Sequence, residues 1–214
     1  MRIGIISDIH GDMPSLTAAI DCLKQQSVDT ILCAGDVVER GSDDHGVISY
    51  LRSNEIPCVQ GNHDENAVRH SEFLQHSNDP DEQETRLSIA AVDFLRTLPL
   101  TRTFHFEQTT LLLAHATPSD NGAPVFQDSS GDALAKKFKK DLARMEADIL
   151  IVGHTHFPFD IRYKGKRVVN SGSVCNLQSR DSHTCGILDL TNQTFSVRTL
   201  INGTSVEFLD REFE

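Results

Sequence analysis

The first sixty residues alternate short apolar runs with longer stretches of helical periodicity. In Pro14–Gln26, apolar side chains recur every three or four residues behind an initial proline, which is the pattern of an amphipathic helix. A second helix is predicted over Asp43–Ser53, and the apolar runs between these segments predict strands. The predicted strands are Arg2–Ser7, Thr30–Ala34 and Pro57–Gln60. This order of strands and helices indicates parallel pairing in an α/β layout.

The middle of the chain is more helical, and its last third is rich in strands. Helices are predicted over Glu65–Gln75, Glu82–Arg96 and Asp132–Met145, and the lysines of the last one are interpreted as a solvated face. Further strands are predicted over Thr109–Ala114, Asp148–Val152, Arg167–Asn170, Thr184–Leu190, Phe195–Leu200 and Val206–Leu209. We expect this later part to be mostly antiparallel. Two sheets packed face to face, with helices outside, would bury both parts.

Polar side chains that can bind metals follow five of these strands, at the point where each strand ends. They are Asp8 and His10, then Asp36, then Asn62 with His63 and Asp64, then His115, and finally His154 with His156. Ligands in α/β sheets bind in the crevice at the carboxyl ends of the strands, so we expect these side chains to converge. Asp8 and His10 are two residues apart, as are His154 and His156, so each pair can reach one ion from an extended strand end.

The candidate ligands combine oxygen donors with imidazoles and include no thiolate, which suits Mn, Fe, Zn or Co. There are seven of them: Asp8, His10, Asp36, Asn62, His115, His154 and His156. Seven donors are too many for one catalytic ion with an open position, and they are enough for two ions that share a carboxylate. A lone histidine is more often structural, but five sets in this order favour a metal centre.

Composition narrows the class of partner and the compartment. The chain has 214 residues, long enough for one domain with a buried core, and we expect residues 1–214 to form a single domain. A net charge of -11 argues against a long nucleic-acid groove without excluding a short oligonucleotide. Five cysteines without a CxxC spacing predict a reduced, cytoplasmic protein. No secretory signal and no apolar run of transmembrane length is found, so no membrane partner is expected.

Taken in order, the motifs resemble the series of the calcineurin-like metallophosphoesterase superfamily. The matching segments are Asp8–His10, Gly35–Asp36, Gly61–Asp64, His115 and Gly153–His156. The chain is most similar to small, single-domain, prokaryotic-type members with phosphodiesterase activity. The resemblance implies a four-layer α/β/β/α sandwich of two packed mixed sheets flanked by helices. Ala116 and Ser171 stand where the family often has glycine and proline, and neither change removes a ligand.

The resemblance also implies a role for each residue of the site. One ion would be bound by Asp8, His10, Asp36 and His156, and the other by Asp36, Asn62, His115 and His154. Asp36 would bridge the ions, and His63 would act on the leaving-group oxygen. The implied reaction is in-line attack of a metal-bridging hydroxide on a phosphate ester, most of all a phosphodiester of a small or nucleotide-type substrate. Manganese is the expected metal, with Fe, Zn, Ni or Co as alternatives. Asp64 either orients His63 or caps a turn or helix.

Several alternatives stay open. Gly35–Gly41 resembles the Gly-Asp-x-Val-Asp-Arg-Gly element of the phosphoprotein phosphatases, so Arg40 either binds phosphate or is a surface arginine. This element keeps a dinucleoside polyphosphate hydrolase, a phosphomonoesterase and a protein phosphatase in view. The intact ligand set and His63 disfavour a protein-interaction scaffold, and the lack of tryptophan and of a basic stripe disfavours a nuclease. The remaining histidines are interpreted as surface or structural residues: His45, His70, His76, His105 and His183.

Overall fold

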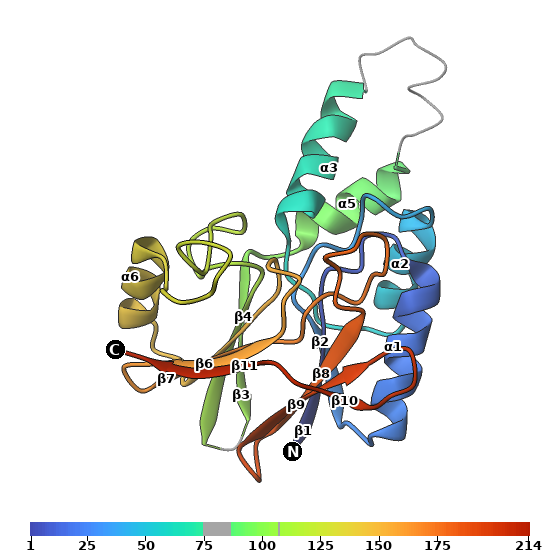
Figure 1. The fold of residues 1–214 in the computed structure, drawn as a ribbon. Helices are drawn as coiled ribbons and strands as arrows, with labels where there is room; N and C mark the ends of the chain where they lie inside the picture. Colours follow the sequence, from blue (N-terminus) through green and yellow to red (C-terminus); the bar gives the residue numbers. More distant parts are fainter. Residues whose placement is uncertain (75–86, 107) are drawn as a thin grey trace.

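A computed structural model describes residues 1–74, 87–106 and 108–214, and its strands form two mixed sheets (Figure 1). In spatial order, the first sheet contains β10 (Ser205–Val206), β9 (Thr194–Thr199), β8 (Thr184–Asp189), β1 (Arg2–Ile6) and β2 (Thr30–Cys33). The second contains β11 (Leu209–Phe213), β6 (Phe159–Tyr163), β7 (Lys166–Asn170), β5 (Ile149–Val152), β4 (Thr109–Ala114) and β3 (Thr101–Phe106). Each sheet includes neighbouring parallel strands, β1 with β2 and β4 with β5.

The two sheets pack face to face through alternate residues of their strands. In β1, Ile3 and Ile5 belong to a buried apolar layer that also contains Leu111 and Leu113 of β4. Ile6 of the same strand belongs instead to the cluster beneath the helices. Since successive side chains of a strand point to opposite faces, this division places one core between the sheets and another outside the first sheet.

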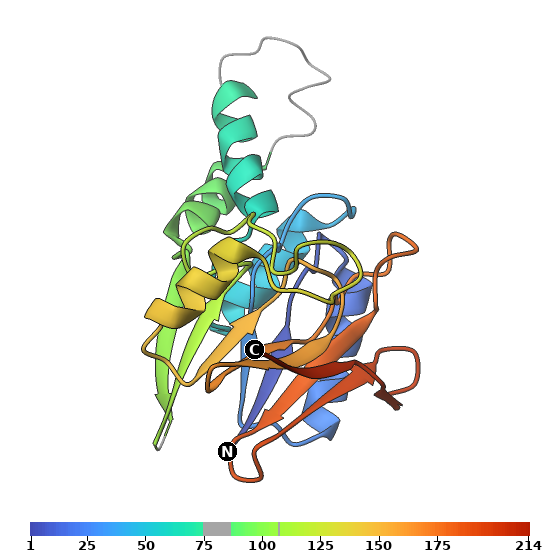
Figure 2. The ribbon, with the colours of Figure 1, turned by 60° about the vertical axis from the view of Figure 1, so that its left-hand side comes forward.

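Helices cover the outer faces of both sheets, on opposite sides of the molecule (Figures 1 and 2). On the first sheet, α1 (Met13–Gln25) and α2 (Asp44–Ser53) cover the outer face, while α3 (Asn62–Leu74) and α5 (Ile89–Thr97) join the same buried cluster and stand beyond the end of the sheets (Figure 1). On the second sheet, α6 (Lys136–Arg144) buries Phe138 and Leu142 against the strands and leaves its lysines outward. The four-layer α/β/β/α sandwich of two mixed sheets is therefore confirmed, and so is the solvated lysine face.

Several predicted elements differ from the structure. The segment Pro57–Gln60 is reduced to one bridge between Cys33 and Cys58, because Pro57 has no N–H to donate and the chain enters α3 directly after Gly61. Strands β3 and β6 were not predicted. The segment predicted as one strand over Val206–Leu209 is divided between β10 and β11.

Other boundaries move by a few residues. Helix α3 begins at Asn62, three residues earlier than predicted, and α6 begins at Lys136 because Leu134 first forms a bridge with Phe126. The predicted helix Glu82–Arg96 is described only as α5, and its first part lies outside the described residues. The later strands are not uniformly antiparallel, since β5 pairs in parallel with β7 and β6 with β11.

The described residues contain no helix long and apolar enough to cross a membrane. All five cysteines are free and buried.

Candidate metal centre

The seven candidate ligands converge at the carboxyl ends of two parallel strand pairs, one pair from each sheet. Asp8 and Asp36 follow β1 and β2, while His115 and His154 follow β4 and β5. Asn62 is the first residue of α3, so a helix start supplies the ligand that was expected from a strand end. Because parallel strands end at the same edge, the topology brings together residues that are almost 150 positions apart in sequence.

The first group of donors contains Asp8, His10, Asp36 and His156. His10 Nε2 lies 3.2 Å from His156 Nε2, and His156 Nε2 lies 3.3 Å from Asp8 Oδ1. Asp36 Oδ2 is 3.8 Å from His10 Nε2. All four residues are buried.

The second group of donors contains Asp36, Asn62, His115 and His154, and it shares Asp36 Oδ2 with the first group. His115 Nε2 lies 3.2 Å from Asp36 Oδ2 and 3.2 Å from Asn62 Oδ1, and His154 Nδ1 lies 3.0 Å from Asn62 Oδ1. Nitrogen and oxygen ligands at about 2.0–2.2 Å from one ion are themselves about 3.0–3.5 Å apart. The distances in both groups fit that spacing except that from His10 Nε2 to Asp36 Oδ2, which is longer at 3.8 Å, and Asp36 belongs to both groups.

Hydrogen bonds outside the two groups fix which ring nitrogen is available. Nδ1 of His10 donates to the Val38 carbonyl (3.2 Å), and Nδ1 of His115 donates to the Ala34 carbonyl (2.7 Å). Nδ1 of His156 donates to Asp181 Oδ1 over 2.7 Å. Each of these three rings therefore turns Nε2 toward the centre, and this nitrogen can bind a metal once it carries no proton.

The charges at the site also suit a cation. Burial lowers the pKa of His10 to about 4, so its ring is neutral and its lone pair is free. Burial opposes the charged form of His115 too, but the charge and hydrogen bond of Asp36 outweigh it and raise the His115 pKa to about 10. Buried carboxylates thus attract positive charge here, and a metal ion would displace the His115 proton.

Five of the seven candidate ligands have left-handed backbone conformations. Their φ angles are 54° at Asp8, 52° at His10, 53° at Asp36, 66° at His154 and 57° at His156. Such conformations cost of order 1–3 kcal/mol per residue and persist where the surroundings enforce them. At these strand ends, the left-handed turns direct the side chains of the candidate ligands toward one point.

Two glycines of the motifs are required by close approach to the carboxylates. A Cβ atom at Gly61 would collide with Asp36 Oδ1, and one at Gly153 would collide with the Ser7 hydroxyl and lie 2.7 Å from Asp8 Oδ2. The motif glycines therefore leave room for the ligands.

His63 lies beside the two groups, and its ring is held at both nitrogens. Nδ1 donates to Glu39, and Nε2 accepts a hydrogen bond of 2.8 Å from the Arg40 guanidinium. The backbone N–H of His63 donates to Asp36 Oδ1 over 2.9 Å. Glu39 was not singled out in the sequence, although it lies in the same glycine-bounded segment as Arg40. Arg40 is exposed and lines the cavity above the centre, so it is not a remote surface residue.

Asp64 serves the backbone and does not contact His63. Its carboxylate accepts hydrogen bonds from the N–H groups of Asp36 (3.0 Å), Val37 (2.8 Å), Val38 (3.2 Å) and Gly61 (2.9 Å). Burial and the charge of Asp36 raise the pKa of Asp64 to about 7, while these N–H groups favour its ionised form. Of the two predicted roles, the geometry supports the capping one.

A cavity of about 220 Å³ lies over the candidate ligands. Its lining residues are Asp36, Arg40, Asn62, His63, His154, Thr155, His156 and Arg180. Arg180 and Asp181, on the loop between β7 and β8, were missed in the sequence because they follow no strand and belong to none of the motifs.

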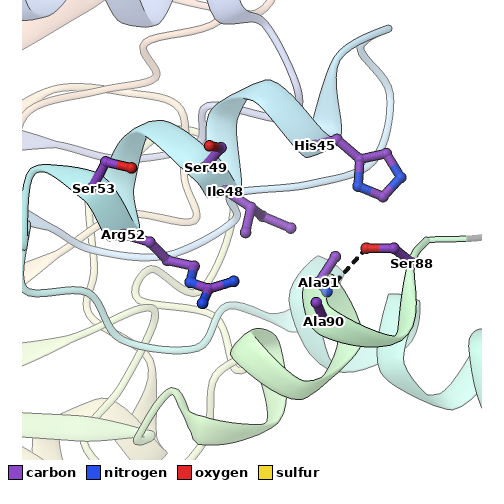
Figure 3. A pocket seen from close by; sticks show the side chains of 8 residues that line it. All are labelled: His45, Ile48, Ser49, Arg52, Ser53, Ser88, Ala90 and Ala91. Carbon is purple, nitrogen blue, oxygen red and sulfur yellow. Dashed lines mark hydrogen bonds between the residues drawn. The ribbon is translucent and has the colours of Figure 1, made fainter.

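The remaining histidines lie elsewhere. His45 lines a different cavity, of about 500 Å³, between α2 and α5, together with Ser49, Arg52 and Ser88 (Figure 3). His105 contacts Thr110 across strands β3 and β4. His70 is exposed on α3 and His183 contacts the Val174 carbonyl, whereas His76 lies outside the described residues.

This chain resembles known proteins both in sequence and in fold. The chain is 25% identical over 177 residues to an uncharacterized protein of Methanocaldococcus jannaschii, covering 80% of this chain and 69% of that protein. The fold is similar to a metallophosphoesterase from Sphaerobacter thermophilus, with a TM-score of 0.70, 21% identity, and 97% and 89% of the two chains covered. It is also similar to an archaeal phosphodiesterase, with a TM-score of 0.58, 20% identity, and 96% and 100% covered. Residues 1–193 match the model of the calcineurin-like phosphoesterase superfamily domain, and the chain belongs to this family of metal-dependent phosphoesterases.

Proposed function

We propose that the protein hydrolyses phosphodiesters of small or nucleotide-type substrates at a centre of two divalent metal ions. The observation that carries this proposal is the arrangement of seven nitrogen and oxygen donors in two groups that share Asp36, with His63 at their edge. Two ions spaced about 3.5–4 Å apart suit phosphoryl transfer, because such a pair holds both the attacking and the leaving oxygen.

The proposed ligand sets follow the two groups of donors. The first ion would be held by Asp8, His10, Asp36 and His156, and the second by Asp36, Asn62, His115 and His154. Mixed carboxylate, amide and imidazole ligands without sulfur favour manganese, with Fe, Zn, Ni or Co as alternatives. When bound, the ions would supply Lewis acidity, lowering the pKa of water and neutralising charge on the phosphoryl oxygens.

The neighbouring side chains have separate roles in this proposal. Once Arg40 has left Nε2 and this nitrogen has taken up a proton from water, His63 would pass that proton to the departing oxygen, while Glu39 accepts from Nδ1. Arg40 would move from His63 to a phosphoryl oxygen as substrate enters, since guanidinium binds phosphate well. Both side chains are already within hydrogen-bond reach of His63.

The size and charge of the molecule support a small ester. The cavity over the centre measures about 220 Å³, enough for a phosphate group with little of its substituents. A net charge of -11 is unfavourable for a long polyanion. Five buried free cysteines support action in a reducing compartment, which we propose is the cytoplasm.

Steady-state hydrolysis of bis-p-nitrophenyl phosphate and p-nitrophenyl phosphate, each with Mn, Ni, Co, Zn and Mg, tests the proposal. We expect metal-dependent turnover with a higher kcat/KM for the diester. A higher value for the monoester would favour a phosphatase. No turnover with any of these ions would contradict the enzyme assignment and favour an interaction scaffold.

A further inference from the structure

A second cavity adjoins the one over the candidate ligands, and both are lined by His154, Thr155 and Arg180. The second measures about 550 Å³, compared with about 220 Å³ for the first, and lies within the usual range of small-molecule sites. The proposed reaction needs only the first cavity, around the phosphorus atom. The larger one is placed to receive the group attached to that phosphate.

One wall of this second cavity is an exposed aromatic ring that is next in sequence to a candidate metal ligand. Phe157 directly follows His156, is 51% exposed and lines the second cavity. Its backbone N–H donates to Thr155 Oγ1 over 3.2 Å, and Asn170 Nδ2 also donates to that oxygen, over 3.0 Å. The backbone of Phe157 is therefore held to the same turn that carries two candidate ligands.

The remaining wall, residues 124–131, is built before any ligand arrives. Gln127 N–H donates to the Ala133 carbonyl (2.8 Å) and Ala135 N–H donates to the Val125 carbonyl (2.9 Å). Asp128 Oδ1 accepts from the Ser130 backbone (3.0 Å) and hydroxyl (2.6 Å). From Gln127 to Ser130 this segment offers polar groups along a fixed edge, whereas its first residues, Pro124 to Phe126, and Phe157 are apolar.

We propose that this second cavity binds the nucleoside part of the substrate, with the base on Phe157 and the phosphate next to Arg180. The inference rests on the proposed phosphodiesterase function and names the substrate class, a nucleoside 5′-phosphate ester. A nucleobase combines a flat face that stacks on aromatic rings with an edge that forms hydrogen bonds, and these are the two kinds of wall present.

Charge distinguishes this occupant from a polyphosphate chain. Among the described residues that line the second cavity, Arg180 is the single lysine or arginine, and Asp128 contributes a negative charge. A chain of further phosphates would need more cations than this. A neutral nucleoside joined to one phosphate fits these charges, because its single negative group lies at the boundary of the cavities, next to Arg180.

Binding of adenosine 5′-monophosphate and ribose 5-phosphate to the manganese-loaded protein, measured by calorimetry, tests the inference. The two ligands share phosphate and ribose, so the difference between their Kd values reports the base alone. We expect adenosine monophosphate to bind about tenfold more tightly, the order of magnitude of one base–aromatic stack. Phe157→Ala should remove this advantage and leave the Kd of ribose 5-phosphate within twofold of wild type.

Two further variants separate the base from the phosphate. Arg180→Gln should weaken both ligands to a similar extent, because it removes a partner of the phosphate that they share. Leu100→Ala is a matched control, since Leu100 is 52% exposed and lines neither cavity, and it should change neither Kd.

Equal binding of the two ligands by the wild type, or an unchanged preference in Phe157→Ala, would overturn the nucleoside site. Continued hydrolysis of bis-p-nitrophenyl phosphate in that case would leave the phosphodiesterase function standing. Absence of both hydrolysis and binding would overturn the proposed function and this inference together.

Discussion

The residues closest to the proposed chemistry differ in how far other side chains hold them in place. Both ring nitrogens of His63 form hydrogen bonds, yet the ring belongs to neither group of candidate ligands in the proposed assignment. His156 belongs to one group and depends on Asp181 for the orientation of its ring. Substitution at His63 should therefore affect turnover, whereas substitution near His156 should affect metal affinity.

Replacing His63 by alanine tests the first half of this distinction. Loss of a general acid slows turnover by roughly 10²–10⁴-fold, so His63→Ala should lower kcat by that amount while metal content stays at two ions per chain. Stopped assays and elemental analysis of the same preparation give both quantities. His105→Ala, on exposed β3, is the control and should keep full activity. Full activity of His63→Ala on several substrates would refute the assigned role.

Replacing Asp181 by asparagine tests the second half. Loss of the carboxylate that orients a metal-binding histidine typically weakens affinity by 10–100-fold, so Asp181→Asn should weaken one of the two ions by this factor. Metal titration followed by calorimetry would resolve the two sites. Asp189→Asn is a matched control, because Asp189 also accepts from two backbone N–H groups but contacts no histidine. Equal metal affinity in Asp181→Asn and wild type would show that Asp181 does not support the site.

Among the elements, α3 is joined to the turn after β2 by the carboxylate of Asp64 as well as by the contacts of His63. Asp64, in the first turn of α3, accepts four backbone hydrogen bonds from the Asp36–Val38 turn and Gly61. These bonds position Asp36 relative to Asn62, so the same residue stabilises the fold and holds the carboxylate that the two groups of candidate ligands share.

Asp64→Ala should therefore be strongly destabilising. Each buried N–H left without a partner costs about 1–3 kcal/mol, and we expect the free energy of unfolding in urea to fall by at least about 3 kcal/mol. Asp43→Ala gives the matched comparison, because Asp43 caps α2 through one bond to Gly46 N–H, and loss of such a cap costs about 1 kcal/mol. Similar losses in the two variants would contradict the special role of Asp64.

The elements also show what sequence patterns can and cannot predict. Strands β1, β2 and β4 were predicted to within a residue, because continuous apolar runs followed by polar motifs mark buried strands. Strand β3 was missed because as an edge strand it carries Arg102 and His105 among its apolar residues. Candidate ligands were singled out because each follows a predicted strand, whereas Glu39 and Asp181 were missed because only the folded loops bring them to His63 and His156.

For the molecule as a whole, the candidate metal centre lies where the two sheets meet. Asp8 and Asp36 come from the first sheet, His115 and His154 from the second, so an ion bound by both groups would link the two central layers. Both carboxylates are buried next to each other, which is unfavourable without a compensating cation. Metal binding should consequently be coupled to the stability of the entire sandwich, and activity is not needed to observe it.

Thermal unfolding of the chelated protein with and without added manganese measures this coupling. A ligand at one hundred times its Kd stabilises the folded state by about 2.7 kcal/mol, and for a chain of this size the Tm should rise by about 5–10 °C. In Asp36→Asn the rise should disappear, because the shared carboxylate serves both ions and its loss weakens both. Asp29→Asn, at an exposed position before β2 and thus at the opposite end of that strand from Asp36, should retain the full rise. An equal rise in Asp36→Asn and wild type would show that manganese binds elsewhere, and the geometry of the two donor groups would then need another explanation.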